Sequence, residues 1–316
     1  MGQPPHVYRR RRLIGLGAVA ALAMLAGATV GAGGDGSGRP SKQRPAAGPR
    51  ADTVRRAELP RGGRRLFPDY RVVAFYGAPQ ARELGELGIG SPDSAAARLR
   101  RQAKPYERKT RPVLPAFELI ATIANAHPGQ DGLYRTRQPD AVIRRYLRAA
   151  RRAKAILILD IQPGHASFMD EVVALDRWLR EPDVSLALDP EWSTPGAKPG
   201  TVIGSVSAEQ VNEVARHLAA IVAEHKLPEK LLVIHQFTND MIQGKAEVIK
   251  PPGLAVTMNV DGFGDRANKV SKYRAFTQDG TRFHDGYKLF YREDVGLMKP
   301  ASVLALKPPP DLVVYE

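Results

Sequence analysis

The sequence contains no cysteine. Disulfide bonds, thiolate metal sites and a cysteine nucleophile are therefore excluded, and so is a lipid-modified N-terminal cysteine. Three common motifs are also missing: the Gly-x-Ser-x-Gly turn of α/β-hydrolases, the Gly-x-x-x-x-Gly-Lys-Ser/Thr loop of nucleotide-binding proteins, and the HxH or HExxH spacing of many zinc enzymes. Carboxylates thus become the main candidates for chemistry.

Acidic residues are fewer than basic ones, since 33 Asp and Glu face 47 Lys and Arg and give a net charge of +14. Residues 1–70 hold 13 basic and 4 acidic residues, a net of +9, so most of the excess lies at the N-terminus. No aromatic-basic motif accompanies it, and we expect no nucleic-acid partner. A basic segment beside a membrane is instead attracted to anionic lipid or wall polymer.

The N-terminus has the composition of an export signal. Arg9–Arg12 precede the uncharged apolar run Leu13–Ala32, which has small residues suited to cleavage and is also long enough to span a bilayer, a length of ~20 residues. Residues 1–32 are predicted to be a signal peptide or a membrane anchor, and both alternatives stay open. We therefore expect an extracytoplasmic protein, secreted or anchored to the cytoplasmic membrane, that contacts the membrane through this segment if it is uncleaved.

Residues 33–65 are rich in Gly, Pro, Arg and Ala. Such a composition buries too little apolar surface to fold, so it predicts a disordered tether, with Ala51–Leu59 as a candidate short helix. The remaining residues, 66–316, form one predicted domain, because the 43% hydrophobic content supports a sizeable core.

Within this domain, short apolar runs alternate with helical patterns. Several of the runs are almost continuously apolar, as expected of strands covered on both faces. The predicted strands are Val72–Tyr76, Val113–Ile120, Ala155–Gln162, Val184–Glu191, Leu231–Phe237, Leu254–Asp261, Tyr287–Tyr291 and Leu312–Tyr315. The predicted helices are Ser94–Lys104, Asp140–Ala153, Phe168–Leu179, Ser207–His225, Asp240–Val248, Ala267–Phe276 and Ala301–Leu306.

Eight strand-helix units in ~250 residues predict a (β/α)8 TIM barrel of the α/β class. No helix pattern follows the eighth strand, and the segment before the first strand is a candidate to cover that position. The alternative is an open, doubly wound sheet. It would require a Gly-rich phosphate turn after an early strand, and Tyr76-Gly77-Ala78-Pro79 is not one.

Two stretches place acids on one face of a strand. In Val184–Trp192, VSLALDPEW, alternation puts Asp189 and Glu191 on the face of the small residues, opposite the bulky apolar face. In Ala255–Gly262, AVTMNVDG, Asp261 holds the same position. Barrel strands have this pattern, with bulky residues outward against helices and chemistry at the carboxyl ends.

The carboxyl ends of the predicted strands together define an acidic, aromatic mouth. Glycoside hydrolysis needs one carboxylic acid and one carboxylate, while aromatic rings and amides bind sugars. This reaction requires no cofactor, and we expect none. The predicted catalytic residues are Glu191, Asp189 and Asp261, and the predicted substrate-binding residues are Tyr76, Glu118, Asp160, Gln162, Trp192, His235, Gln236 and Asn259. Tyr291 and Tyr315 also belong to this predicted mouth.

Leu186–Trp192, LALDPEW, resembles the Asp-x-Glu strand end of TIM-barrel glycoside hydrolases, in particular the family 25 lysozymes that cleave peptidoglycan. The resemblance implies that Glu191 is the proton donor, with Asp189 as its neighbour, and that the partner is a cell-wall glycan or another extracellular polysaccharide. Family 25 enzymes also have an Asp at the end of the first strand, where this sequence has Tyr76-Gly77.

Two other functions fit the same residues. One is a metal-dependent TIM-barrel hydrolase or isomerase, with Glu118, Asp160, Asp189, His235 and Asp261 as oxygen and imidazole ligands. The other is a barrel without catalysis that holds a wall glycan. Fold alone does not separate these functions.

Overall fold

The computed structural model describes residues 56–280 and 282–316. The predicted export segment and most of the predicted tether lie outside the described residues. Among the helices of the described residues, none is long and apolar enough to cross a membrane.

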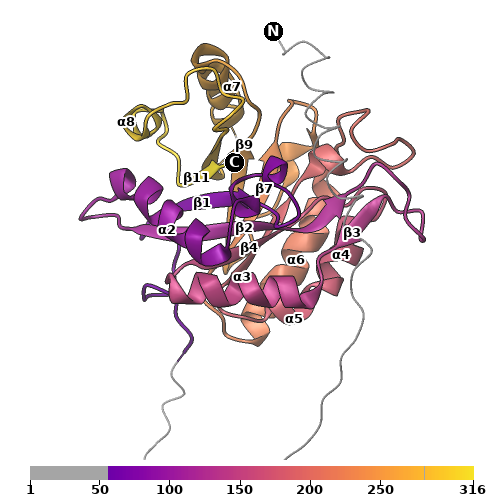
Figure 1. Ribbon diagram of the computed structural model, residues 1–316, viewed down its shortest axis with the longest axis horizontal. Coiled ribbons are helices and arrows are strands. Elements are labelled where there is room, and N and C mark those ends of the chain that lie inside the picture. The colour runs from indigo at the N-terminus through magenta and orange to yellow at the C-terminus, as the bar shows by residue number, and fades with distance from the viewer. Residues whose placement is uncertain (1–55, 281) are drawn as a thin grey trace, which may run out of the picture.

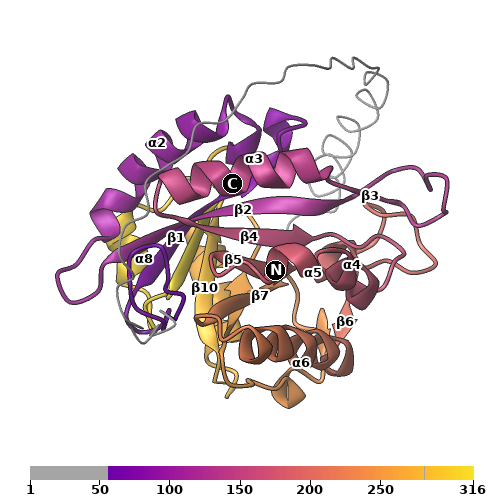
Figure 2. The ribbon, with the colours of Figure 1, turned by 90° about the horizontal axis from the view of Figure 1, so that it is seen from below.

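Eight parallel strands in the described residues close into a barrel (Figures 1 and 2). Each strand pairs with its neighbours along the chain, and β11 pairs back onto β1. The barrel is thus a (β/α)8 TIM barrel, as predicted, and the open-sheet alternative is wrong. The eight strands are β1 (Arg71–Gly77), β2 (Val113–Ala124), β4 (Ile156–Ile161), β5 (Val184–Leu188), β7 (Lys230–Gln236), β9 (Leu254–Val260), β10 (His284–Leu289) and β11 (Leu312–Tyr315).

Helices surround the strands. Figure 2 shows α2 and α3 on the side of β1 and β2, and α6 along another side of the barrel. Helix α6 starts at a capping box formed by Ser207 and Gln210. The helices are α2 (Pro92–Ala103), α3 (Asp140–Arg152), α4 (Phe168–Ala174), α5 (Asp176–Leu179), α6 (Ala208–Glu224), α7 (Arg266–Thr277) and α8 (Pro300–Leu304).

Two of the predicted helices differ from the structure. The predicted helix Phe168–Leu179 is split at Leu175 into α4 and α5. The predicted helix Asp240–Val248 is wrong, because Gly244 takes a left-handed φ of 68° between the short strand β8 (Ile242–Gln243) and the 3-10 turn η5 (Lys245–Glu247). β8 pairs with β6 (Val206–Ser207) beside the barrel.

Short elements complete the described chain. Strand β3 (Arg135–Arg137) pairs antiparallel with the extended end of β2. Further 3-10 turns are η1 (Arg82–Leu84), η2 (Glu86–Gly88), η3 (Lys104–Tyr106) and η4 (Pro190–Trp192).

The bulky outward face and the small inward face predicted for β5 and β9 are confirmed. Val184, Leu186 and Leu188 belong to the apolar layer between strands and helices, whereas Ala187 and Ala255 belong to the separate core inside the barrel. This division follows from the period of two in strand side chains. It directs the inward residues at the strand ends towards one another.

The segment before β1 closes the amino-terminal end of the barrel. Leu59 and Leu66 are buried in the interior core, and Glu229 at the foot of β7 accepts a hydrogen bond from the Leu66 N–H at 2.6 Å. The Arg64 side chain donates to the carbonyl of Leu227 at 2.8 Å. The ordered domain therefore starts before residue 66, and its described part before β1 has no helix at Arg56–Leu59.

Candidate active site

Every barrel strand contributes one polar side chain at or just beyond its carboxyl end. These side chains are inward by strand parity, and most are buried. They form a charged layer above the apolar interior core. The eight residues are Tyr76, Glu118, Asp160, Asp189, His235, Asn259, Lys288 and Glu316.

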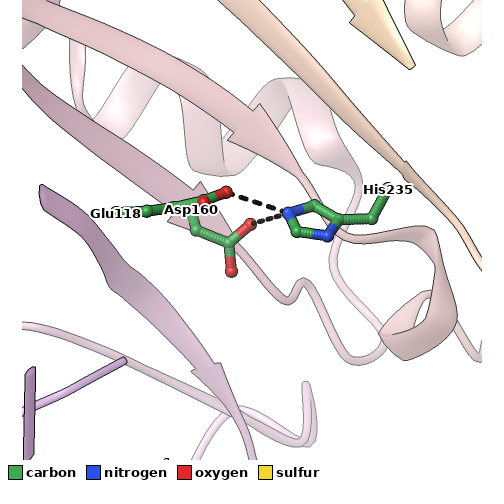
Figure 3. Close-up of side chains that lie close together, drawn as sticks. All are labelled: Glu118, Asp160 and His235. Atoms are coloured by element: carbon green, nitrogen blue, oxygen red, sulfur yellow. Dashed lines mark hydrogen bonds and ion pairs between the residues drawn. The ribbon is translucent and has the colours of Figure 1, made fainter. Parts of the chain in front are cut away.

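His235 occupies the centre of this layer. Its Nδ1 lies 2.9 Å from Asp261 Oδ2, and its Nε2 lies 2.9 Å from Glu118 Oε1 and 3.8 Å from Asp160 Oδ1. Figure 3 shows Glu118 and Asp160 converging on the ring from neighbouring strands. Burial lowers the pKa of His235, but hydrogen bonds from its ring to Asp261 and Glu118 outweigh burial and raise that pKa well above its usual value.

Lys288 on β10 is a site residue that sequence reasoning missed. Its Nζ lies 3.1 Å from Asp261 Oδ2, 2.9 Å from Glu316 Oε2, and 3.8 Å from the centre of the Tyr76 ring. Burial lowers the pKa of Lys288, but the carboxylates of Asp261 and Glu316 raise it above its usual value. The predicted strand Tyr287–Tyr291 begins too late, and β10 in fact begins at His284.

Two carboxyls in the site have opposite proton affinities. Burial raises the pKa of Asp189 well above its usual value. Burial also raises the pKa of Asp261, but the charges of Lys288 and His235 outweigh it and hold that pKa far below the usual range. The protein thus favours the protonated form of Asp189 and the ionised form of Asp261.

Asp160 is a third buried carboxyl. Burial raises its pKa to about 7, against the opposing charge of His235. Its Oδ2 accepts a hydrogen bond from the Tyr76 hydroxyl at 3.2 Å, and Gln162 donates to the same hydroxyl at 3.0 Å. Gln162 and Tyr76 thus connect this buried carboxyl to the surface of the mouth.

Above the charged layer lies a pocket that is open to solvent. Asp189, Glu191 and Asp261 face it together, so the structure brings the three predicted catalytic residues to one cavity. Glu191 is half-buried and lies on η4, because the strand stops at Leu188 ahead of Pro190. Lys288 and Glu316 also line the pocket, with Leu84, Glu83, Ile120, Gln162 and Gly262 and the aromatic side chains of Tyr76, Trp192, Phe237, Phe263 and Phe290.

Five of the residues predicted to bind substrate do not line this pocket, and four of them lie beneath it. Glu118, Asp160 and His235 lie beneath it, each at most 1% exposed, and Asn259 lies beside them with its amide nitrogen 3.4 Å from His235 Nδ1. These residues support the pocket from below.

Three predictions for the mouth are wrong, because side-chain direction in a strand alternates. The alternation that turns His235 inward turns Gln236 outward, and its amide donates to the backbone of Thr238 at 3.3 Å. Tyr291 and Tyr315 stack on each other in the outer apolar layer, with ring centroids 5.3 Å apart.

Hydrogen bonds hold the loop of residues 193–200 beside the barrel. The Thr194 N–H donates to the Gly164 carbonyl at 3.0 Å, and a His165 ring nitrogen lies 2.8 Å from the Ala197 carbonyl. The loop does not line the pocket.

Comparisons with known proteins give structural likenesses at low identity. No protein-family model and no curated protein sequence matches the chain, so nothing supports membership of the family 25 lysozymes. A sialic acid aldolase from Ruminococcus gnavus has a TM-score of 0.40 and 13% identity, covering 78% of this chain and 68% of its own.

Two GH18 chitinases give similar values. The one from Pseudoalteromonas aurantia has a TM-score of 0.40 and 10% identity, covering 78% of this chain and 93% of its own. ChiB from the chitin utilization locus of Flavobacterium johnsoniae has a TM-score of 0.40 and 8% identity, covering 78% and 87%. These likenesses carry no argument about the reaction.

Proposed function

We propose that this protein is an exported glycoside hydrolase that acts on a cell-wall or other extracellular polysaccharide. One observation carries the proposal: Glu191, Asp189 and Asp261 face the same aromatic-lined pocket. Hydrolysis of a glycosidic bond needs a proton donor and a carboxylate at the same time. Burial raises the pKa of Asp189, whereas Lys288 and His235 lower that of Asp261, so the pocket favours opposite protonation states at neighbouring carboxyls.

In this mechanism Glu191 protonates the leaving oxygen. It is the least buried of the three acids and reaches the pocket from η4, whereas Asp189 lies at the strand end. Asp189 lies beside Glu191. Because burial raises the pKa of Asp189, it favours the neutral form and adds no second negative charge next to the proton donor. Asp261, kept ionised by Lys288 and His235, stabilises positive charge at the sugar or activates the attacking group.

The aromatic side chains support the choice of a carbohydrate. Trp192, Phe237, Phe263 and Phe290 give the pocket flat apolar surfaces, while the Gln162 side chain offers hydrogen bonds. Sugars present apolar ring faces and polar edges, which this mixture matches. The export part of the proposal depends on Arg9–Arg12 and Leu13–Ala32, outside the described residues, and a reporter fused after Ala51 tests it: activity only in the cytoplasm would reject export.

The hydrolase is tested by release of reducing ends from a panel of wall and extracellular polysaccharides. Glu191→Gln keeps shape but removes the transferable proton, so turnover should fall by ~10²–10⁴ while glycan binding persists. Glu213→Gln, on the distant helix α6, is the matched control. Unchanged turnover in Glu191→Gln would reject the assignment, and binding by the parent protein without any cleavage would indicate a glycan-binding barrel instead.

A further inference from the structure

Beneath the pocket, the ends of β2, β4 and β7 bring together three side chains that the proposed hydrolysis does not use directly. Glu118 and Asp160 are fully buried, and His235 is 1% exposed (Figure 3). None of them lines the pocket. Such buried ionisable groups need a reason to be there, because isolated charges are costly in a protein interior.

The three side chains have the spacing of a metal-binding site. One ligand atom from each residue lies within 4.8 Å of the other two. His235 Nε2 is 2.9 Å from Glu118 Oε1 and 3.8 Å from Asp160 Oδ1. Ligands bound tetrahedrally at about 2.1 Å from zinc lie about 3.4 Å apart, so the two separations from His235 Nε2 need adjustments of about half an ångström.

A second observation is the set of buried oxygen atoms left without hydrogen bonds. Glu118 Oε2 and Asp160 Oδ1 have no partner, and neither has Asn259 Oδ1 close by. A buried polar atom without a partner costs about 1–3 kcal/mol, and such atoms in a native fold mark a water or ion site. Two of the six such atoms in the described residues belong to the candidate ligands, and Asp160 Oδ1 points towards the histidine.

The surrounding residues orient the ligands in the way metal sites require. His235 Nδ1 lies 2.9 Å from Asp261 Oδ2, which fixes the ring and leaves Nε2 facing the two carboxylates. Tyr76 donates to the other oxygen of Asp160 at 3.2 Å. Metal-bound histidines almost always donate their second ring nitrogen to a carboxylate or carbonyl, and bound carboxylates are themselves hydrogen-bonded.

The balance of charge also favours a cation. Leaving out Asp189, which burial favours in its protonated form, the buried carboxyls Glu118, Asp160 and Asp261 outnumber the cationic side chains of Lys288 and His235. A divalent ion among Glu118, Asp160 and His235 would add positive charge where carboxyls are in excess.

We propose that Glu118, Asp160 and His235 bind one first-row transition-metal dication, represented by Zn²⁺, beneath the pocket. An imidazole nitrogen with two carboxylates suits zinc and its neighbours, whereas Mg²⁺ and Ca²⁺ prefer all-oxygen ligands in larger number. The ion supports the pocket from below. The test of this inference is separate from that of the hydrolase proposal, since it measures metal binding and not glycan cleavage.

The experiment is a metal titration of the full-length protein after treatment with a chelator and desalting. Zn²⁺ should bind at one equivalent by elemental analysis and calorimetry, and it should raise the thermal unfolding midpoint. Asp160→Asn and Glu118→Gln should each weaken this binding by at least ~10-fold, the lower end of the loss found when even an outer partner of a metal ligand is removed. His217→Ala is the control, because His217 pairs with Asp176 at 2.7 Å on the surface.

Three results would overturn the proposal. They are failure of the parent protein to bind Zn²⁺, binding that Asp160→Asn and Glu118→Gln leave unchanged, and tighter binding of Mg²⁺ than of Zn²⁺. Circular dichroism identifies a variant that fails to fold, and the other conservative variant then decides. Because the readout is metal stoichiometry, loss of glycan cleavage neither supports nor rejects this site.

Discussion

Lys288 Nζ lies 3.1 Å from Asp261 Oδ2, and both side chains are buried and line the pocket. This ion pair explains how a carboxyl in an apolar barrel stays ionised. Desolvation alone would raise the pKa of Asp261, and Lys288 is the largest of the opposing influences. The pair therefore connects the stability of the barrel to the protonation state of its pocket.

Lys288→Met should destabilise the fold and change its pH profile. Removing one partner of a buried ion pair leaves an uncompensated charge and costs about 3–5 kcal/mol. The pKa of Asp261 should rise, so the acid limb of the pH–rate profile should move to higher pH. Urea denaturation and pH-dependent kinetics measure the two effects.

Lys230→Met is the matched control for Lys288→Met. Lys230 is also buried, but it lies at the amino-terminal start of β7, where its Nζ donates to the Glu181 carbonyl at 2.7 Å, and it does not line the pocket. It should lose stability without moving the acid limb. Equal shifts of the limb in both variants would contradict a direct role of Lys288 in holding Asp261 ionised.

The difference between Asp261 and Lys288 shows what the sequence could and could not predict. The period of two in AVTMNVDG predicted the face of Asp261, since the strand boundaries there were clear. For β10, HDGYKL, the polar first half reads as a loop, so the predicted strand began at Tyr287. The sequence does show a lysine next to apolar strand residues. It does not show that this lysine forms an ion pair with Asp261, because that contact exists only in the folded barrel.

Partners distant in sequence were beyond reach for the same reason. The residues that contact His235 come from β2, β4 and the end of β9, and spacing along the chain does not reveal which of them converge. Parity alone would have excluded Gln236 once His235 was placed inward. The fold was more predictable than the site because the alternation of strands and helices repeats eight times, whereas each contact in the site occurs once.

Gly262→Ala should damage the pocket wall. Gly262 has a φ of 106°, and a Cβ there would lie 2.6 Å from Lys272 Nζ and 2.6 Å from the Phe237 ring. Since Gly262 lines the pocket beside Asp261, the displaced ring should reduce glycan affinity and turnover several-fold or more.

Gly196→Ala separates this steric effect from backbone strain. Gly196 has a φ of 80°, and a Cβ there would have no atom within 4 Å. Both substitutions carry the left-handed penalty, of order 1–2 kcal/mol. Comparable binding and turnover in the two variants would show that Gly262 is needed only for its backbone conformation.

Two neighbouring carboxyls, Asp285 and Asp311, lie at the amino-terminal end of the barrel, opposite the pocket. We expect pH to affect stability through them in opposite ways. Burial, assisted by the charge of Asp311, raises the pKa of Asp285 to about 7. The stabilisation from its proton is complete below the unfolded pKa of about 3.9 and is lost as pH rises towards 7. Asp285→Asn mimics the neutral acid. Above pH 7 its free energy of unfolding should exceed that of the parent by on the order of 1 kcal/mol after discounting solvent screening. Near pH 4 the two proteins should be equally stable.

Asp311→Asn should behave in the opposite way. Burial raises the pKa of Asp311, but hydrogen bonds from His284 at 2.8 Å and Arg111 at 2.5 Å outweigh it and lower that pKa. The ionised form therefore stabilises the fold above pH 4, and this contribution is lost as pH falls below that value. Urea denaturation between about pH 2 and pH 8 should show Asp311→Asn weakened at neutral pH, with the difference from the parent lost below about pH 4. The same pH trend in Asp285→Asn and Asp311→Asn would contradict the assignment.

Leu66→Ala should destabilise the domain without altering its chemistry. Leu66 is fully buried in the interior core, and the chain around it closes the end of the barrel opposite the pocket. Truncating a buried leucine to alanine costs about 2–5 kcal/mol, whereas Val295→Ala, at a side chain 71% exposed, should stay within about 0.5 kcal/mol. Because Leu66 lies at the amino-terminal end of the barrel and the pocket lies at the carboxyl end, kcat per folded molecule should be unchanged in both variants. Denaturation midpoints alone would then distinguish them, and an unaltered midpoint in Leu66→Ala would show that the segment before β1 adds little to the barrel.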